Sequence, residues 1–313
     1  MIAAAIDIGT NTVRLLIAKK SEHNTSWHDL VQELEIARLG EGVNETHLIK
    51  PEAMERTLAV LSRYKNIMGQ FGVEKFRVVS TSAMRDAKNA SDFVSLVKNQ
   101  LGFDIDIISG EEEGRLTFAG ATGPDSLVPL NELVLVVDVG GGSTEYIYGR
   151  SGQILGSVSL NIGSVRLTEI FLKHDPPTNH EMQSVRDMIK ELAEPVFKRI
   201  KDARPSIIIA VAGTATQLAA IQYGAEPYDP SKIHGSKITL DELKTLTKKL
   251  ASVPLEGRKK IKGMHPQRAD VIVAGALILE ETLLNLDFSE LVVSEKDMLN
   301  GIIYTLDGWH SFK

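Results

Sequence analysis

Short apolar runs alternate along this chain with stretches in which apolar residues recur every three or four positions. The short runs predict strands at residues 3–6, 13–18, 76–79, 105–108, 133–137, 146–148, 207–211 and 291–293. The helical spacing predicts helices that begin at Pro51, at Glu111, behind an N-cap at Ser91 and after Thr178. Helices dominate beyond residue 216. Strands that alternate with helices in this way are typical of α/β architecture.

One local pattern occurs twice. Residues 7–14 and 138–145 each follow an apolar strand, make a turn of the form Asp-x-Gly with hydroxyl residues, and lead into a second strand. A single hairpin turn with Asp and Gly is ordinary, but two copies that open the two halves of the chain favour a duplicated fold. We therefore predict domains at residues 1–124 and 125–294, with a turn-rich linker at 121–126 and a final helix, 295–313, that completes the first domain.

The two turns carry groups that suit phosphate. Glycine allows backbone N–H groups to approach an anion closely, and the nearby hydroxyls add donors. A carboxylate beside such donors, Asp7 in one turn and Asp138 in the other, fits a divalent cation or an activated water. A third turn, at Gly213 and Thr214, either binds an anion at a helix N-terminus or simply caps the helix through Thr214. The chain has neither a GxxxxGK[ST] loop nor a GxGxxG turn at the start of a βαβ unit.

Composition narrows the classes of function. The 313 residues have a formal net charge of −6 and only 5% aromatic residues, which argues against a general nucleic-acid binder. The absence of cysteine excludes disulfides, thiolate nucleophiles and iron–sulfur clusters. The N-terminus does not resemble a signal peptide and the longest apolar stretch, 271–279, is too short to span a membrane. We expect a cytoplasmic protein. The basic run 258–262 is either a solvated helix end, which we favour, or a track for the distal part of a long polyanion.

Several segments together carry a family resemblance. They are residues 5–12, 80–89, 108–116 and 138–145, with 268–270 and 274–275 nearer the end. These segments resemble the exopolyphosphatase/guanosine pentaphosphate phosphohydrolase (Ppx/GppA) family of the actin/Hsp70/sugar-kinase superfamily, over essentially the whole chain. The resemblance implies an α/β protein of two duplicated actin-like (ribonuclease-H-like) domains around a central cleft.

The resemblance also implies an activity and a set of site residues. The activity is hydrolysis of the terminal phosphate of linear polyphosphate by a water that Glu113 activates. The phosphate-binding residues would be Asp7, Thr10, Asn11, Arg14, Arg85, Gly140, Gly141, Gly142, Ser143, Thr144, Gly213, Thr214 and Arg268. Asp138 and Glu145 would hold Mg²⁺ or another divalent cation.

For several residues in these segments, a purely structural role remains an open alternative to a role in catalysis or binding. Glutamates are favoured in the first turn of any helix, which is enough to explain Glu111 and Glu112. Arg14 and Arg268 are either phosphate ligands or members of structural ion pairs. Asn11 either donates to phosphate or stabilises its own turn.

Three other functions also remain open. The substrate can be guanosine pentaphosphate (pppGpp) rather than polyphosphate, the protein can be a small-molecule kinase of the same superfamily, or it can be a nucleotide-dependent assembly protein of the actin branch. As partners we expect one of the two phosphate substrates, no general nucleic acid and no membrane, with a homodimer allowed.

Overall fold

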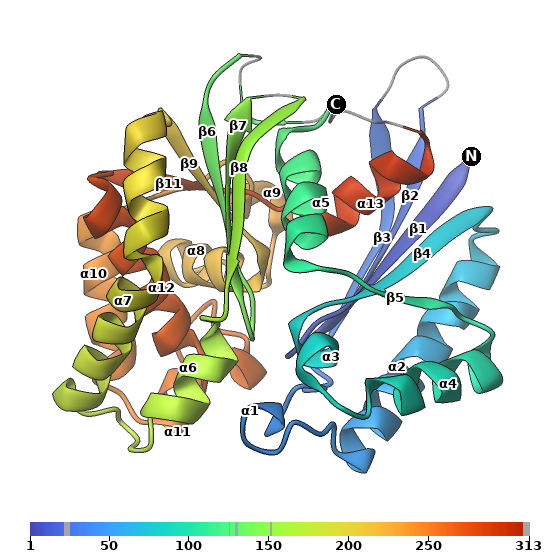
Figure 1. The fold of residues 1–313 in the computed structure, drawn as a ribbon, viewed down its shortest axis with the longest axis horizontal. Helices are drawn as coiled ribbons and strands as arrows, with labels where there is room; N and C mark the ends of the chain where they lie inside the picture. Colours follow the sequence, from blue (N-terminus) through green and yellow to red (C-terminus); the bar gives the residue numbers. More distant parts are fainter. Residues whose placement is uncertain (22–25, 125, 129–130, 151, 309–313) are drawn as a thin grey trace. The chain divides into compact units, whose positions relative to one another are not determined.

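The computed structural model describes residues 1–21, 26–124, 126–128, 131–150 and 152–308 (Figure 1). The chain forms two compact units, which are residues 1–126 with 298–313 (unit 1) and residues 127–297 (unit 2). The sequence placed the corresponding divisions after residues 124 and 294. Asp125 of the predicted linker and residues 309–313 of the predicted terminal segment lie outside the described residues.

Unit 1 is built on a five-stranded sheet. The strands are β1 (Ile2–Ile8), β2 (Val13–Lys20), β3 (Trp27–Glu35), β4 (Lys75–Ser80) and β5 (Ile105–Ile107). They lie in the order β3-β2-β1-β4-β5, with β1, β2 and β3 antiparallel and β4 and β5 parallel to β1. Asp7 therefore stands near the carboxyl end of the central strand, which is the usual location of ligands in such sheets.

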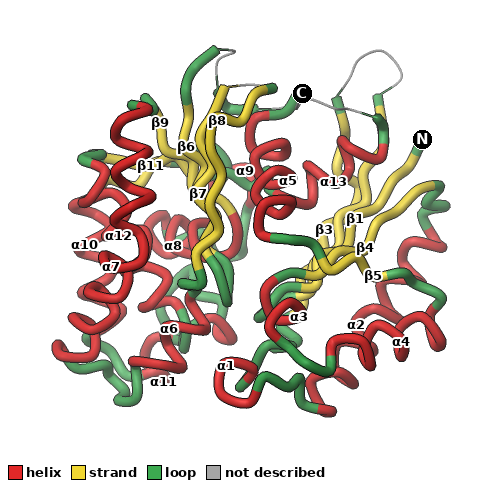
Figure 2. The backbone as a smooth tube through the Cα atoms, viewed as in Figure 1, coloured by secondary structure: helices red, strands yellow, loops and turns green. Residues whose placement is uncertain are grey.

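Helices cover both faces of this sheet (Figure 2). They are α1 (Val43–Thr46), α2 (Pro51–Gln70), α3 (Ser82–Asp86), α4 (Ala90–Leu101), α5 (Gly110–Thr122) and α13 (Met298–Leu306). Side chains alternate along β1, so Ala4, Ile6 and Ile8 pack against α2 and α4, whereas Ala3 and Ala5 pack against α5 and α13. Asp7 follows the same alternation as Ala3 and Ala5, and it therefore points to the α5 face.

Unit 2 repeats this sheet and extends it by one strand. The strands are β6 (Val134–Val139), β7 (Thr144–Arg150), β8 (Gln153–Leu160), β9 (Ile207–Val211), β10 (Lys237–Thr239) and β11 (Glu290–Val293). The order is β8-β7-β6-β9-β11-β10, in which the first five strands match the order and directions of unit 1. The predicted duplication is confirmed by this topology, and the fold is mixed α/β with two actin-like domains.

The helices of unit 2 enclose its main core. They are α6 (Ser164–Phe171), α7 (Asn179–Ala203), α8 (Ala212–Tyr223), α9 (Pro230–Ile233), α10 (Leu240–Ala251), α11 (Leu255–Arg258) and α12 (Ile272–Leu286), with a short 3₁₀ turn at Pro266–Arg268. Leu135, Val137 and Tyr146 of the sheet pack in this core against α7 and α12. No helix among the described residues is both long and apolar enough to cross a membrane.

Helix α13 returns the chain to unit 1. Met298, Ile302 and Ile303 are buried against β1, β2 and α5. Gly301 allows this close packing, because a Cβ at that position would lie 1.8 Å from the carbonyl oxygen of Leu116. The predicted return of the final helix to the first domain thus depends on one glycine at the helix–helix contact.

Three local expectations differ from the structure. Strands β3, β8 and β10 had no clear sequence signal and were not predicted. Ser91 lies inside α4, whose N-cap position is Asn89, so the predicted cap is wrong. Helix α8 begins at Ala212 behind Val211, which places Thr214 within its first turn rather than at its cap.

Candidate active site

The first Asp-Gly turn joins β1 to β2 in unit 1. Gly9 N–H donates to the Thr12 carbonyl at 2.9 Å and closes the turn. The carbonyls of Thr10 and Asn11 accept from the N–H groups of Gly40 and Arg38, both at 2.9 Å. The peptides of this turn are thus fixed by a neighbouring segment. That segment approaches closely, since a Cβ on Gly40 would lie 2.4 Å from Thr10 Cγ2.

Asp7 and Arg14 form an ion pair beside this turn. They stand directly opposite each other on β1 and β2, and Arg14 Nη2 lies 2.8 Å from Asp7 Oδ2. Arg14 Nε donates to the same oxygen at 3.0 Å. The structural ion pair that the sequence left open for Arg14 therefore exists, and it lies within the predicted site. The buried Thr10 hydroxyl lies 2.8 Å from the Ser82 hydroxyl, which ties the turn to the first residue of α3.

Glu113 and Arg85 meet on the same side of unit 1. Glu113 lies in the first turn of α5 and is 7% exposed, and Arg85 ends the short helix α3. Arg85 Nη1 lies 2.7 Å from Glu113 Oε2 and also donates to the Ile108 carbonyl at 2.9 Å. The start of α5 and the end of α3, separated in sequence by α4 and β5, thus bring together a buried carboxylate and a guanidinium.

The surroundings of Glu113 change its proton affinity. Burial raises the pKa of Glu113 from 4.5 to about 7, against the opposing charge and hydrogen bond of Arg85. The charge of Asp7 raises this pKa further, and Arg14 lowers it. The charges of Arg85, Asp7 and Arg14 therefore all influence the pKa of Glu113. A carboxylate with a pKa near neutrality suits a general base at physiological pH.

The neighbouring glutamates have other roles. Glu111 is exposed, and Glu112 pairs with Arg77 at 3.1 Å and with Arg115 at 3.3 Å. Successive helical residues point about 100° apart, so only Glu113 of the three faces the Asp7 turn. Glu112 is a member of structural ion pairs, whereas the sequence had suggested only the preference for glutamate in the first turn of a helix.

The second Asp-Gly turn, in unit 2, repeats the first in its hydrogen bonding. Gly140 N–H donates to the Ser143 carbonyl at 3.0 Å, which corresponds to the bond between Gly9 and Thr12. Ser143 and Thr144 are buried. The Thr144 hydroxyl donates to the Ile162 carbonyl at 2.5 Å, so that it stabilises the turn from behind.

Asp138 and Glu145 stand opposite each other on β6 and β7, at the positions that Asp7 and Arg14 occupy in unit 1. Both are buried, and Glu145 Oε1 accepts from the Ser159 hydroxyl at 2.6 Å. Directly opposed residues of an antiparallel pair share one face with Cβ atoms about 5 Å apart. Two carboxylates face each other here, where the first hairpin has a carboxylate and an arginine.

This carboxylate pair fits a magnesium ion. Among the described residues no group of three or more His, Asp or Glu side chains is arranged to hold a metal by itself. Mg²⁺ does not require such a group, because it commonly takes one or two carboxylates and completes its shell with water and substrate phosphate. Asp138 and Glu145 are therefore suitable ligands in number and type.

The third turn begins α8. Ala212 adopts a left-handed backbone conformation with φ 63°, which is strained for a residue with a Cβ. Thr214 Oγ1 donates to the Val139 carbonyl at 3.0 Å, and Arg268 Nη1 donates to the Gly213 carbonyl at 2.8 Å. Gly213 has no side chain where the guanidinium lies, since a Cβ would come within 2.7 Å of Arg268 Nη2. The structure thus brings Gly213 and Arg268 together.

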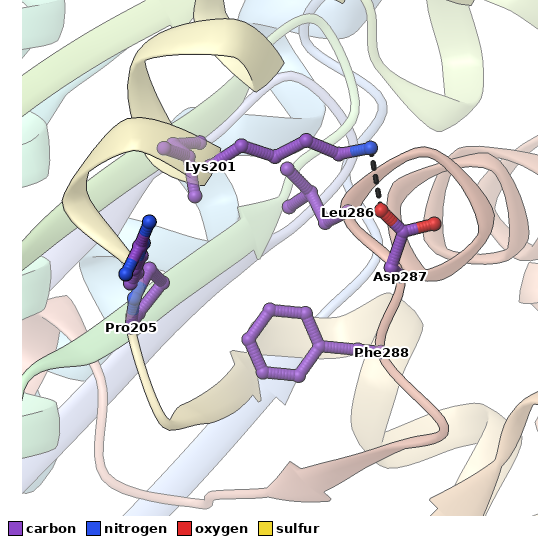
Figure 3. A pocket seen from close by; sticks show the side chains of 7 residues that line it. Lys201, Pro205, Leu286, Asp287 and Phe288 are labelled. Carbon is purple, nitrogen blue, oxygen red and sulfur yellow. Dashed lines mark ion pairs between the residues drawn. The ribbon is translucent and has the colours of Figure 1, made fainter.

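A cavity of about 380 Å³ in unit 2 lies away from these turns (Figure 3). Its lining comes from the end of α7, the end of α12 and the residues just before β9 and β11, and Lys201 pairs there with Asp287 at 2.6 Å. This is the amino end of the parallel strands, whereas ligands of such sheets bind at the carboxyl ends. None of the predicted site residues lines this cavity.

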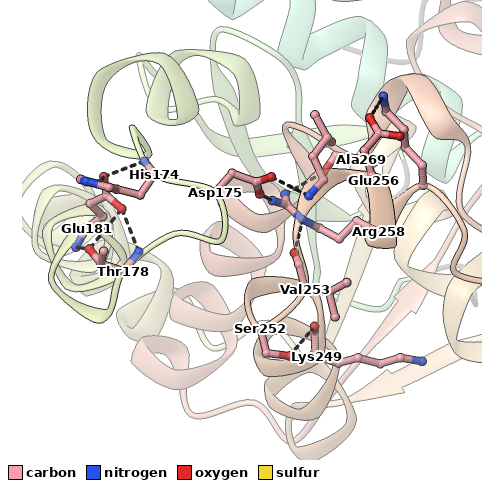
Figure 4. A network of polar contacts seen from close by, with 12 residues as sticks. His174, Asp175, Thr178, Glu181, Lys249, Ser252, Val253, Glu256, Arg258 and Ala269 are labelled. Carbon is pink, nitrogen blue, oxygen red and sulfur yellow. Dashed lines mark hydrogen bonds and ion pairs between the residues drawn. The ribbon is translucent and has the colours of Figure 1, made fainter.

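Arg258 corrects the expectation for the basic run. Its side chain is buried rather than solvated, and it pairs with Asp175 (Figure 4). It also donates to the carbonyls of Val253 at 3.0 Å and Ala269 at 2.8 Å. Arg258 therefore stabilises the loops that lead to Arg268, and Lys259 pairs with Glu256 at 2.7 Å.

Three further polar residues contact the predicted site residues without having been predicted. Ser82 contacts Thr10, Ser159 donates to Glu145, and Arg166 donates to the Gly142 carbonyl. Ser82 lies in a segment that carried the family resemblance. No motif marks Ser159 and Arg166, whose contacts arise only from the tertiary packing of β8 and α6.

The duplicated sheets and their paired Asp-Gly turns define a protein of the actin-like class. Over residues 16–309 the chain matches the Ppx/GppA phosphatase family, and it belongs to that family. It is 37% identical to exopolyphosphatase 2 of Mycobacterium tuberculosis, over 97% of this chain and 98% of that protein. It is 28% identical to a guanosine-5'-triphosphate,3'-diphosphate pyrophosphatase of Photobacterium profundum, over 97% of this chain and 59% of that protein. The solved structure of an exopolyphosphatase from Cytophaga hutchinsonii has a TM-score of 0.90 at 30% identity, with full coverage of both chains.

Proposed function

We propose that this protein is a phosphoanhydride hydrolase that removes the terminal phosphate of linear polyphosphate, with pppGpp as the alternative substrate. The observation that carries the proposal is the buried Glu113 carboxylate, held by Arg85 beside the Asp7 turn. The name of the 37% identical relative supports polyphosphate. The name of the Photobacterium relative supports pppGpp.

Glu113 would act as the general base. Hydrolysis of a phosphoanhydride requires a positioned water, a base to accept its proton and neutralisation of charge on the phosphate. With a pKa of about 7, Glu113 is ionised in a substantial fraction of molecules at neutral pH and is a strong enough base to accept that proton. The ion pair with Arg85 fixes the carboxylate and provides a cation close to the place where a phosphate is attacked.

The turns would supply the phosphate donors. In unit 1 the carbonyls of Thr10 and Asn11 are held by other backbone donors, so that the N–H groups in the same two peptides, those of Asn11 and Thr12, point the other way. In unit 2 the Gly140–Ser143 turn has the same closing bond. The remaining predicted contacts, those of Arg14, Thr214 and Arg268 with phosphate, stay predictions.

Asp138 and Glu145 would hold Mg²⁺. The bound ion would neutralise phosphate charge and leave the attacked phosphorus more electrophilic. The support for this site is the direct opposition of two buried carboxylates across β6 and β7. The expected cytoplasmic location and the homodimer also remain predictions.

The test compares substrates and variants in one phosphate-release assay. Long polyphosphate, pppGpp and ATP with and without sugars are supplied to the wild-type protein and to Glu113→Gln. We expect turnover of polyphosphate or pppGpp, and a loss of about 10²- to 10⁴-fold in kcat for Glu113→Gln with binding retained. Glu111→Gln, two residues earlier in the same helix and exposed, is the matched control and should keep normal turnover.

Two outcomes would contradict the proposal. Turnover of ATP that depends on a sugar, without hydrolysis of either phosphate chain, would identify a kinase instead. Normal turnover by Glu113→Gln would show that another group is the base.

A further inference from the structure

The first turn of α6 engages the carbonyls of the second Asp-Gly turn. Ser164 N–H donates to the Gly140 carbonyl at 2.9 Å, and the N–H groups of Val165 and Arg166 donate to the Gly141 carbonyl at 2.9 and 3.0 Å. The Arg166 side chain completes the series, because its Nε donates to the Gly142 carbonyl at 2.8 Å. Three successive carbonyls of the turn therefore point towards α6.

This arrangement fixes the direction of the donors in the turn. In a planar trans peptide the N–H points opposite to the carbonyl of the preceding residue. The N–H groups of Gly141, Gly142 and Ser143 consequently point away from α6, side by side. Successive N–H groups with a common direction form an anion-binding concavity, and such donors are effective because they need no reorganisation when the anion binds.

Arg166 differs from the other donors in this series. The backbone N–H groups belong to the helix and recur in any sequence that folds there, whereas the third bond depends on one side chain. Glycine peptides have wide conformational freedom, so without this bond the peptide between Gly142 and Ser143 can rotate. Gly163 is needed for the close approach of α6, since a Cβ there would lie 2.4 Å from the Gly141 carbonyl oxygen.

We propose that Arg166 is a positioning residue for substrate phosphate. It acts through the Gly142 carbonyl and holds the Ser143 N–H towards the phosphate, and it does not contact the phosphate itself. This inference rests on the proposed function, because it requires a phosphate at the second turn. No sequence motif marks Arg166.

Two variants separate this role from a direct charge contact. Glutamine has its Nε2 at the same number of bonds from the backbone as arginine Nε, so Arg166→Gln keeps a donor for Gly142 and loses the charge. Methionine places a methyl group there, so Arg166→Met keeps the shape and loses the donor. Arg199→Met, on the exposed face of α7, controls for removal of a positive charge.

The experiment measures kcat and KM with polyphosphate and pppGpp, and polyphosphate binding by calorimetry in a Glu113→Gln background. We expect Arg166→Met to raise KM and the dissociation constant about 10- to 100-fold with little change in kcat. For Arg166→Gln we expect KM and the dissociation constant to stay within about threefold of the wild-type values. Such a change is much smaller than the loss of one charged hydrogen bond would cause. The pH profile should keep its shape in both variants, because Glu113 is unaltered.

The outcomes distinguish the two proposals. Wild-type protein that neither binds nor hydrolyses either compound contradicts the proposed function and this inference with it. An active wild type with equal impairment of the Gln and Met variants contradicts the inference alone and indicates a direct charge contact. If Arg166→Met does not fold, Gly163→Ala tests the same turn with Arg166 intact, and an unchanged KM in that folded variant contradicts the inference.

Discussion

Single residues in unit 1 set the proton affinity of the candidate base. Arg85 lowers the pKa of Glu113 against the effect of burial, and the balance leaves it at about 7. A base must be deprotonated to act, so turnover should fall about tenfold for each pH unit below 7 and level off above it. The position of this acidic limb therefore measures the balance between burial and Arg85.

Replacing Arg85 with Met should move the acidic limb to higher pH by about one to three units, because a neighbouring positive charge of this kind lowers a carboxyl pKa by that amount. The measurement is the pH dependence of kcat/KM. Arg77→Met is the control, since Arg77 pairs with Asp106 and Glu112 and leaves Glu113 with its partner. A limb that stays in place in Arg85→Met would show that Glu113 is not the titrating base.

Sequence reasoning identified residues with a local signal and missed those without one. Glu113 was chosen as the candidate base because it stands at a helix start in a segment with a family resemblance, and its catalytic role stays a prediction. Arg166 was not, because its contact with Gly142 depends on how α6 packs against the turn. Arg258 was misread for the same reason, since a basic run in the sequence does not reveal that one of its members is buried.

At the scale of helices and strands, α13 and α5 depend on a contact between backbones. A Cβ at Gly301 would lie 1.8 Å from the Leu116 carbonyl oxygen, so Gly301→Ala must push the helices apart and should cost about 1–3 kcal/mol of stability. Denaturant unfolding measures this change. Gly69→Ala is the control, because a Cβ there meets nothing within 4 Å and alanine favours the helix, so this variant should be stabilised by up to about 1 kcal/mol. Equal stabilities would contradict the packing argument.

Strands with a run of apolar residues were predicted, whereas strands without such a run were missed. All residues of β9, and all of β6 except Asp138, are apolar, and both strands were predicted from the sequence. β3 lies at the edge of its sheet with mostly exposed residues, so charged side chains obscure its pattern. β10 contains a single apolar residue, Ile238, so no apolar run marks it, in contrast to the equally short β5.

At the scale of the whole molecule, the same hairpin occurs once in each unit, but the residue opposite its aspartate has a different charge in the two units. Asp7 faces Arg14 in unit 1, whereas Asp138 faces Glu145 in unit 2. The net charge of −6 consequently does not exclude a polyanionic substrate, because the predicted contacts depend on local donors and a cation. The duplication of the fold was predictable from the repeated motif, but the edge strands β3, β8 and β10 and the neighbours that hold each turn were not.

We expect the divalent cation to bind at the hairpin of unit 2, through Asp138 and Glu145, and not at the hairpin of unit 1. Chelation should abolish phosphate release, and Asp138→Asn should raise the Mg²⁺ concentration at half-maximal activity about tenfold or more, because one of two charged ligands is lost. Arg14→Met should leave that midpoint unchanged while it weakens substrate binding. A common midpoint in wild-type protein and Asp138→Asn would place the cation elsewhere.

The return of α13 to unit 1 has a consequence for synthesis on the ribosome. Unit 2 is one continuous stretch of chain, whereas unit 1 is complete only when Met298–Leu306 is present. Chains fold from the N-terminus as they emerge, yet here the N-terminal half must wait until the later half has been made, because Ala3, Ala5 and Leu16 lie in a cluster that α5 covers only in part and α13 completes. The half of the protein that is synthesised first is therefore the last to finish folding.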